Sequence, residues 1–403
     1  MAKHFRSEAN EGPLDSSTVR IEGTQAMNTF FYRFPKCLFL VWLVAATAFI
    51  GAGKARASWE AEWEKTVAAA KKEGQVQVYL SSNQNHLLIQ SGAFQKKFPE
   101  IKVVVALGDP LQRAMTERRV GKYLVDIAFT GPGSLWRLYR AKILDPVRDT
   151  IILPEIADES KWFEGRHYYV DKERKYIFAA IGNVDLGEIF YNTKLVNPKE
   201  YRSFLDFLRP ELQGKMTARD VRTQGPGSVT MRIFYYMPEL GPGFIRRLFG
   251  EMDLTLFRDQ RQGIDWLATG KYPICFFCSH SRVYAAQRQG LPVESFGVMK
   301  EGAGLIVSGG SISIVNRAPH PNAAKVFINW YLSREGQLAV QRAGGGTANS
   351  RRIDIPKDMV QPDRRPQEGV KYYDAENWER ISMDPILKEL RAAVAEAEKR
   401  KKK

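Results

Sequence analysis

Predicted strands and helices alternate along the first part of this chain. Runs of apolar residues at Gln75–Gln84, Ile101–Leu107 and Val125–Thr130 have the pattern of strands that end in polar loops. Between them, His86–Phe98 and Leu111–Gly121 have the spacing of helices. Strand, helix and strand in this order form a parallel sheet with helices packed on it. The sequence therefore predicts an α/β fold.

The loops after the first and third strands form the first candidate site. In parallel sheets, ligands bind where the carboxyl ends of the strands open into a crevice. Small polar residues stand at both positions, namely Ser81, Ser82 and Asn83 in one loop and Thr130, Gly131 and Ser134 in the other. Glycine lets a ligand approach backbone N–H groups, and hydroxyls both donate and accept hydrogen bonds. Ordinary turns have the same composition, so both interpretations stay open.

A glycine-rich turn before the predicted helix Val229–Tyr236 is the second candidate site. The predicted strand Met216–Val221 leads directly into this turn. A helix that begins this way presents free backbone N–H groups and a positive dipole end, which favour a carboxylate or another anion. The candidate ligand residues are Arg222, Thr223, Gly225, Gly227 and Ser228. Arg222 would add a formal charge, whereas Ser228 is equally suited to capping the helix.

A third candidate site, Ser279, His280 and Ser281, follows the predicted strand Ile274–Cys278. Arg282 follows these residues and is a further candidate charge partner for an anion. Adjacent histidine and serine side chains do not align as base and nucleophile, and no acidic residue stands at a recognisable spacing. We therefore expect ligand contacts here rather than a hydrolase site.

Cys275 and Cys278 form a C-x-x-C pair in apolar surroundings. A disulfide, a metal pair and two separate buried thiols are the alternatives. Residues i and i+3 of a strand point to opposite faces, and their Cα atoms lie too far apart for a disulfide. The sequence therefore predicts two buried thiols.

The region before Ser58 has the layout of a secretory signal peptide at 27–57. Two basic residues precede the uncharged apolar run Cys37–Gly53, and the small residues Ala55 and Ala57 follow. We expect cleavage after Ala57 and a periplasmic protein, with an uncleaved membrane anchor as the alternative. Residues 1–26 lack apolar periodicity and precede a second methionine, which indicates a non-native or disordered extension.

The chain is basic, with a formal net charge of +15. Part of this charge lies in the leader and in the basic tail, where Lys399–Lys403 are all cationic. The remaining excess fits an acidic ligand or an anionic membrane surface, and a solvated basic face is the alternative. The sequence contains no nucleic-acid-binding motif, so a nucleic-acid partner is not expected.

The order of these parts resembles the type 2 periplasmic substrate-binding proteins of ABC transporters, a group that includes the ferric-ion binding proteins. The matching stretches are Val76–Ser82, Asp126–Thr130, Ile189–Leu195 and His320–Gln337 with the following Asn349–Arg352. The resemblance implies a two-lobed Venus-flytrap fold with two crossover hinge strands and a ligand between the lobes. Lobe 1 would comprise 58–186 and 303–345, and lobe 2 would comprise 187–302 and 346–403 with the C-terminal helix.

The resemblance also implies where a ferric ligand set would lie. The matching positions hold Asn83, Gly131 and His280–Ser281, although Fe³⁺ prefers phenolate and carboxylate oxygens. Tyr235–Tyr236 lies inside a predicted helix, where aromatic packing explains it better. We therefore predict no metal and no cofactor. Ferric binding through an altered ligand set, for example with His86, is the alternative within the family.

These observations predict a monomeric solute-binding component of an ABC importer. It would capture a small, polar, anionic organic solute and deliver it to a permease in the inner membrane. Trp136 would pack in the first lobe or stack on the ligand. A secreted enzyme built on the same fold is the alternative from another class, and it would need an acid–base pair in the cleft. We expect no enzymatic activity.

Overall fold

The computed structural model describes residues 58–81, 83–222 and 227–402. They belong to one compact unit that runs from Arg56 to Lys403. The predicted signal peptide and the candidate ligand residues Ser82, Thr223 and Gly225 lie outside the described residues. Within the described ranges, the helices are all too short or too polar to cross a membrane.

The first half of the unit is built on a six-stranded sheet with the order β2-β1-β3-β13-β4 and with β5 beside β13. Its strands are β1 (Gln75–Leu80), β2 (Lys102–Leu107), β3 (Ile127–Thr130), β4 (Leu144–Asp145), β5 (Phe178–Ala179) and β13 (Ser311–Val315). β1 runs parallel to β2 and β3, whereas β13 runs antiparallel to β3. The predicted parallel arrangement of the first three strands is confirmed.

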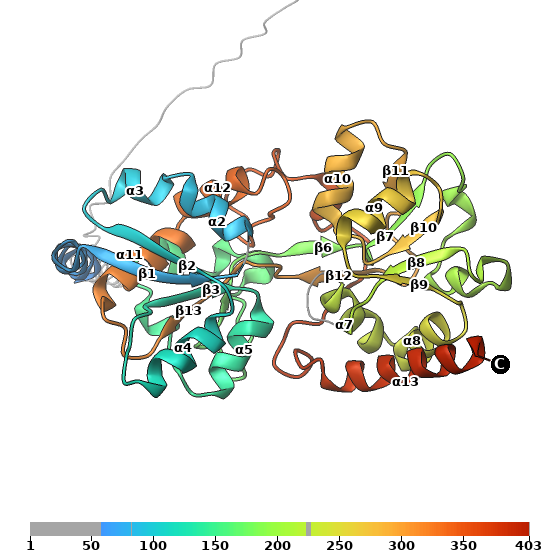
Figure 1. Cartoon of the computed structure of the whole chain (residues 1–403). Helices are drawn as coiled ribbons and strands as arrows, with labels where there is room; N and C mark the ends of the chain where they lie inside the picture. Colours follow the sequence, from blue (N-terminus) through green and yellow to red (C-terminus); the bar gives the residue numbers. More distant parts are fainter. Residues whose placement is uncertain (1–57, 82, 223–226, 403) are drawn as a thin grey trace, which may run out of the picture. The chain divides into compact units, whose positions relative to one another are not determined.

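Helices cover both faces of this sheet (Figure 1). One face carries a helix at 58–73 and α2 (Asn83–Gln90), α3 (Ala93–Lys97), α11 (Pro321–Leu332) and α12 (Arg334–Ala343), and the other carries α4 (Pro110–Arg119) and α5 (Pro132–Arg140). Val78 and Leu80 pack with Phe327 of α11, whereas Tyr79 packs with Leu135 of α5. This alternation follows from the two-residue period of a strand.

The second half is built on a five-stranded sheet with the order β11-β7-β10-β8-β9. Its strands are β7 (Ile189–Asn192), β8 (Met216–Arg219), β9 (Thr255–Phe257), β10 (Ile274–Phe276) and β11 (Val293–Ser295). The helices α7 (Ser228–Tyr236), α8 (Gly241–Gly250) and α13 (Asp384–Lys401) pack on one face, and α9 (Gln260–Ala268) and α10 (His280–Arg288) pack on the other.

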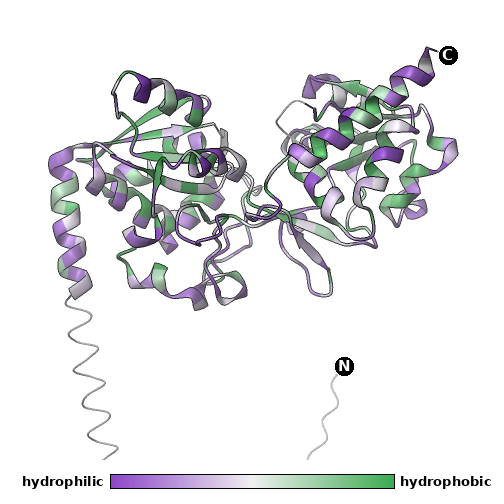
Figure 2. Cartoon of the chain, turned by 90° about the horizontal axis from the view of Figure 1, so that it is seen from below, coloured by the Kyte–Doolittle hydropathy of each residue, from purple (hydrophilic) through white to green (hydrophobic). Residues whose placement is uncertain are grey.

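The C-terminal helix α13 belongs to the core of this second half. Its sequence is charged along its whole length, but Ile386, Leu390, Ala393 and Val394 are buried on one side. Figure 2 shows hydrophilic and hydrophobic segments alternating along this helix. The spacing of these residues places them on one helical face, which explains why a charged helix packs on α8.

A small sheet joins the two halves. It contains β14 (Tyr372–Asp374), β12 (Ala303–Ile306) and β6 (Asn183–Asp185), in that order. Along the chain, β6 stands between β5 of the first sheet and β7 of the second, and β12 precedes β13 of the first sheet. The chain therefore passes from the first half to the second through β6 and returns through β12, as expected for two crossover strands.

Shorter elements complete the described chain. They are α6 (Pro154–Ala157) and the 3₁₀ helices η1 (Arg148–Thr150), η2 (Glu159–Lys161), η3 (Phe163–Gly165), η4 (Pro198–Glu200), η5 (Phe204–Leu208), η6 (Pro210–Leu212) and η7 (Pro362–Arg364). η5 begins after a capping box formed by Ser203 and Asp206. The predicted helix His86–Phe98 is interrupted, because Gly92 has a φ of 69° between α2 and α3.

The small-residue segment Gly302–Asn316 is not the single strand that its composition predicts. It forms β12 and β13, which belong to different sheets. Ser308 lies between them with a φ of 56°. An extended strand cannot continue through this left-handed backbone conformation. The turn therefore transfers the chain from the joining sheet to the first sheet.

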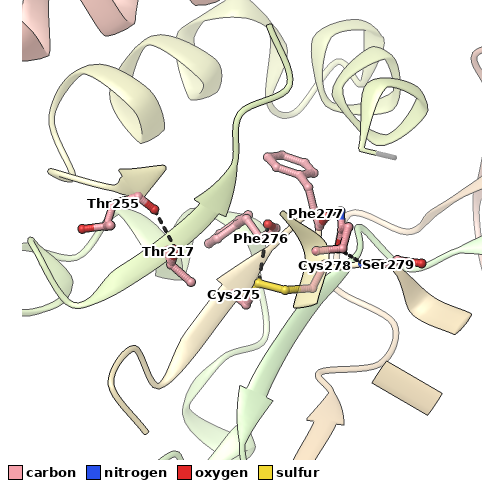
Figure 3. The surroundings of a disulfide bond; sticks show 8 residues. Thr217, Thr255, Cys275, Phe276, Phe277, Cys278 and Ser279 are labelled. Atoms are coloured by element: carbon pink, nitrogen blue, oxygen red, sulfur yellow. Dashed lines mark hydrogen bonds between the residues drawn. A yellow bond between two sulfur atoms is a disulfide. The ribbon is translucent and has the colours of Figure 1, made fainter. Parts of the chain in front are cut away.

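The prediction of two separate thiols is wrong, because Cys275 and Cys278 form a disulfide with Cα atoms 6.1 Å apart (Figure 3). The prediction assumed a strand through Cys278, but β10 ends at Phe276. Phe277 has a φ of 59° and turns the chain. Both cysteines consequently pack among the residues under α9 and α10, whereas the ring of Phe277 packs in the core on the opposite face.

Candidate functional site

The candidate ligand residues in the described chain divide mainly between two cavities. The first, here the Trp136 cavity, has a volume of about 430 Å³ and is lined by Ser81, Thr130, Gly131, Ser134 and Ser228. The second, the His280 cavity, has a volume of about 390 Å³ and is lined by Ser279, His280 and Ser281. Ser308 lines both cavities, so they are neighbours. Ligand contact by these residues stays a prediction.

The first sheet brings the two predicted loops together in the Trp136 cavity. β1 and β3 are adjacent and parallel, and the hydroxyl groups of Ser81 and Thr130 are hydrogen-bonded to each other. Gly131 directly precedes α5 as its N-cap residue and is packed tightly, because a Cβ atom there would lie 3.2 Å from the backbone oxygen of Ser308. Asn83 is the first residue of α2.

Two helices of different halves begin at the Trp136 cavity. The lining includes the first turn of α5, from Pro132 to Ser134, and the first residues of α7, Ser228 and Val229. In α5, Pro132 has no N–H group and the N–H of Ser134 donates to the backbone oxygen of Gly131, but the helix dipole is positive at the start of both helices. The cavity therefore has two sources of positive potential besides its charged side chains.

Gly227, rather than Ser228, is the N-cap residue of α7, and ligand contact by both residues stays a prediction. Ser228 is the first residue of α7 rather than its cap, and its buried Oγ has no hydrogen-bond partner among the described residues. Gly227 has a φ of 87°, and a Cβ atom there would lie 2.6 Å from Cβ of Phe277. Gly227 is therefore required by backbone conformation and close packing.

Arginines supply formal charge in the Trp136 cavity. Arg137 and Arg140 of α5 line it together with Arg232 of α7. Arg232 is only 4% exposed and its Nη2 lies 2.9 Å from Oε1 of Glu376, whereas Arg137 pairs with Asp109. Arg140 is exposed. The carboxylates in the lining are Glu376, which Arg232 neutralises, and Asp384.

The helix period would have been sufficient to predict Arg137 and Arg140. They lie three and six residues after Ser134 in α5, on the same side of the helix. Trp136 also lines the cavity and stacks on Tyr139, with ring centroids 5.1 Å apart. Arg232 and Glu376 were not predictable in this way, because they are far apart in the chain and meet only after folding.

The two arginines predicted as charge partners lie elsewhere. Arg222 binds both carboxylate oxygens of Asp220, through Nε at 2.8 Å and Nη2 at 2.9 Å. It does not line either cavity, and neither does Arg282, which is exposed on α10. Asp220 precedes Arg222 by two residues, so this pairing was visible as a possibility in the sequence.

The His280 cavity contains a coupled set of ionisable groups. Nε2 of His280 lies 2.8 Å from Oδ2 of Asp363. Burial lowers the pKa of His280, and the charge of Arg364 lowers it further. Burial acts to raise the pKa of Asp363, but the hydrogen bond and charge of His280, together with Arg364, give a net lowering. Sequence analysis missed Asp363 and Arg364, which lie more than eighty residues from His280.

Glu188 lines the His280 cavity, whereas Asp363 contacts His280 but is not among the described lining residues. Its Oε2 atom is buried and has no hydrogen-bond partner among the described residues. Burial, followed by the negative charge of Asp185, raises the pKa of Glu188 to about 8. Glu188 also has a φ of 46° just before β7. No local pattern marks this acid, because its burial depends on elements from distant parts of the chain.

The contacts of His280 do not form a serine nucleophile and base. Its Nδ1 atom has no partner in the described part of the chain, and the hydroxyl groups of Ser279 and Ser281 lie 3.2 Å from each other. Asp363 thus orients the His280 ring, but neither ring nitrogen contacts a serine hydroxyl group of the described residues.

The described residues contain no group of three or more histidine, cysteine, aspartate or glutamate side chains that could hold a metal ion. Tyr235 and Tyr236 lie in α7 with ring centroids 5.0 Å apart and pack against the core of the second half. They do not line the Trp136 or the His280 cavity.

Among the comparisons with known proteins, only the comparison of structures finds similar proteins. No protein-family model and no curated protein matches the sequence. One similar structure is Trichodesmium IdiA (FutA) in complex with iron and citrate, at 17% identity and a TM-score of 0.59, covering 79% of this chain and 99% of that one. Another is AfuA of Actinobacillus pleuropneumoniae with bound fructose-6-phosphate, at 19% identity and a TM-score of 0.57, covering 81% and 99%.

A third similar structure is the substrate-binding protein of an ABC transporter from Agrobacterium tumefaciens. It has 14% identity and a TM-score of 0.58, and the alignment covers 81% of this chain and 96% of that one. These structures are covered almost completely, so the likeness extends over both halves. The chain therefore has the two-lobed α/β fold of the type 2 periplasmic substrate-binding proteins of ABC transporters.

Proposed function

We propose that this protein is the solute-binding component of an ABC importer and that its solute is a small, polar, organic anion. The observation that carries the proposal is the Trp136 cavity, where the first turns of α5 and α7 meet beside three arginines. Helix N-termini bind carboxylates and phosphates through free N–H groups and the helix dipole. Hydroxyl groups of Ser81, Thr130 and Ser134 would orient the solute.

The two helix starts also give a reason for lobe closure. α5 packs on the six-stranded sheet, and α7 packs on the five-stranded sheet. An anion that binds both helix starts would favour a closed arrangement, because it makes more contacts there than in an open one. In this proposal lobe 1 is 58–186 with 303–345, lobe 2 is 187–302 with 346–403, and a membrane permease recognises the closed form.

The organic ligands named with the similar structures support an anionic solute, but they do not identify which anion this protein binds. Citrate and fructose-6-phosphate are both anionic, whereas the iron that is named together with citrate corresponds to the ferric alternative. The proposal also includes a monomeric protein, exported to the periplasm after cleavage of the leader at Ala57.

A ligand screen on the mature chain, residues 58–403, tests the function. Thermal shift and titration calorimetry would compare di- and tricarboxylates, sugar phosphates, phosphonates, neutral sugars and metal salts. We expect an organic anion to stabilise the protein by several degrees, because a ligand that binds only the folded state adds to its stability. A response to Fe³⁺ salts alone, or to neutral sugars as strong as that to anions, would contradict the proposal.

The contact between His280 and Asp363 keeps a secreted enzyme as a second candidate. A poised acid–base pair is what that alternative needs. Nuclear magnetic resonance spectra of each stabilising compound, recorded before and after incubation with the protein, distinguish the two. The binding-protein proposal requires that the compound is recovered unchanged.

A further inference from the structure

A third cavity, here the Arg351 cavity, shares no lining residue with the other two. Its volume is about 320 Å³, and its lining is Phe163, Gly182, Leu305, Asn349, Ser350, Arg351, Ile353, Lys357, Arg365 and Pro366. Gly182 precedes β6, and Leu305 lies in β12. The cavity therefore lies against both segments that connect the two halves.

One side of the Arg351 cavity is apolar. Phe163, Leu305, Ile353 and Pro366 supply this side. Ile353 is 58% exposed although it is a large aliphatic residue, whereas Leu305 is buried in the joining sheet. An apolar body of a ligand would be removed from water here and would cover Ile353.

The other side of the cavity is cationic. Arg351, Lys357 and Arg365 are in the lining, and the described lining residues include no aspartate or glutamate. None of these three cations forms an ion pair with a described carboxylate. Lys357 donates to the backbone oxygen of Ser350 and to Gln341. Burial lowers the pKa of Lys357 to about 8, and a nearby anion would oppose this shift.

Two neighbouring arginines show what is unusual about Arg351. Arg352 binds Asp354 through Nε at 2.9 Å and Nη2 at 2.7 Å. Arg351 is also buried, at 5% exposed, but Nε donates to the backbone oxygen of Ile181 and Nη2 has no partner among the described residues. The ring of Tyr168 covers its guanidinium at 4.0 Å.

Two further lining residues of this cavity have unmet hydrogen-bonding capacity. Nε of Arg365 and Oδ1 of Asn349 are also buried without a partner in the described ranges. Glu164, Asp374 and Glu376 act on Arg351 only through their charge and do not line the cavity. Leaving a buried cation without a bonded partner is costly, and a carboxylate is the partner that suits a guanidinium best.

We propose that the Arg351 cavity is a second ligand site, which binds a small amphipathic carboxylate. The carboxylate pairs with the guanidinium groups of Arg351 and Arg365, which line the cavity, and the apolar body packs on Leu305, Ile353 and Phe163. This site is separate from the solute cavities and does not depend on the function proposed for them.

Titration calorimetry with straight-chain carboxylates tests the proposal on the mature protein. The series runs from acetate to octanoate, with hexanamide and hexanol as uncharged matches for hexanoate. We expect affinity to rise about three- to fourfold for each added methylene until the cavity is full. We also expect hexanamide and hexanol to bind at least tenfold more weakly than hexanoate. Equal binding of hexanoate and hexanamide would overturn the proposal.

Substitutions at the edge of the cavity test whether hexanoate binds in the Arg351 cavity. Arg365→Gln removes one donor, and Ile353→Asp places a carboxylate at an exposed position in the lining. Each is expected to weaken hexanoate binding at least tenfold. Arg342→Gln changes an exposed arginine of α12 outside the cavity and is expected to change binding less than twofold.

Two further results would count against the site. One is hexanoate binding that is lost in Arg140→Gln and kept in Arg365→Gln, because the carboxylate would then lie in the Trp136 cavity. The other is equal weakening by Arg365→Gln and Arg342→Gln, which would indicate a general effect of net charge. Thermal unfolding of each variant shows that the fold is retained, and Ile353→Asp provides a second test if Arg365→Gln unfolds.

Discussion

The Trp136 and His280 cavities share Ser308 but differ in the chemistry of their walls. The Trp136 cavity has two helix starts and three arginines. The His280 cavity also has two arginines, Arg288 and Arg364, but it adds the buried carboxylate oxygen of Glu188 and the imidazole of His280, which pairs with Asp363. Neighbouring cavities of one protein thus favour different ligand groups. In our proposal the first binds the anionic group of the solute, and Glu188 of the second accepts hydrogen bonds from hydroxyl or amide groups.

This difference gives the proposed solute an orientation. Its acidic group would lie at the starts of α5 and α7, and its hydroxyl or amide groups would lie toward Glu188 and His280. A protonated Glu188 is also a donor, so the preference of the His280 cavity depends on pH. The following predictions test the difference between the cavities, beginning with the largest expected effect.

Gly227→Ala is expected to lower the free energy of unfolding by about 4 kcal/mol. The new Cβ would meet Phe277 and Val221 at a positive φ, and both overpacking and backbone strain are costly. Gly133→Ala is the matched control, because a Cβ there meets no atom within 4 Å. Urea unfolding measures both. A loss for Gly227→Ala no larger than that for Gly133→Ala would show that the start of α7 is not held by this packing.

Glu188→Gln tests the raised pKa in the His280 cavity. The folded state holds the proton of Glu188 more tightly than the unfolded state, so this group stabilises the fold fully below its unfolded pKa near 4.5. That contribution is lost as pH rises toward the folded pKa of about 8. Glutamine stays neutral throughout. The stability of Glu188→Gln relative to wild type should therefore increase by about 3 kcal/mol between pH 5 and pH 9.

The expected 3 kcal/mol is less than the full shift would imply, because Glu188 is partly exposed as a residue and titrates together with Asp185. Chemical unfolding at a series of pH values provides the measurement. Glu396→Gln, at an exposed position of α13, is the control and should show no such trend. A difference between Glu188→Gln and wild type that does not change with pH would refute a raised pKa.

Loss of the disulfide is expected to cost about 2 kcal/mol, since it closes a loop with a sequence separation of 3. The double variant Cys275→Ala/Cys278→Ala avoids the need for a reductant. Ser279 and His280 follow the disulfide directly, so the double variant should disturb the His280 cavity more than the Trp136 cavity. The solute analogue with hydroxyl groups should therefore lose more affinity than the analogue without them. Unfolding experiments and titration of two solute analogues, with and without hydroxyl groups, measure both effects. Equal losses for the two analogues would contradict a local role.

Arg140→Gln is expected to weaken binding of the anion found in the ligand screen about tenfold, or about 1.4 kcal/mol. Arg140 is exposed and lines the Trp136 cavity. Arg282→Gln is the matched control, because Arg282 is exposed but lies outside both cavities. Titration calorimetry compares the two. If Arg282→Gln had the larger effect, the charge partner predicted from the sequence would be the correct one.

Local patterns were sufficient to predict a large part of this protein. The alternation of strand and helix from Gln75 to Thr130 predicts parallel strands, and β1 and β3 indeed bring Ser81 and Thr130 into contact. The turn before Val229 predicts a helix start, which α7 confirms. These predictions succeed because a side chain's face on a strand or helix depends on residues a few positions away.

The errors arise where a distant contact changes the local backbone. A strand through Cys278 was a reasonable prediction, but Phe277 has a left-handed backbone and packs against Gly227, fifty residues earlier. The small apolar and polar residues of Gly302–Asn316 favour one continuous strand, but the segment divides at Ser308 between two sheets. In both cases the favourable packing of distant elements outweighs the local preference for an extended chain.

The sequence by itself determined the α/β class, the strand ends that face a cavity and the start of α7. Only the tertiary structure decided which of these groups meet, because the walls of a cavity come from segments that are far apart in the chain. Glu188 meets Arg364 and His280 in this way, and Arg232 meets Glu376 beside α5. The same applies to Arg351, whose missing partner becomes visible only when the folded chain surrounds it.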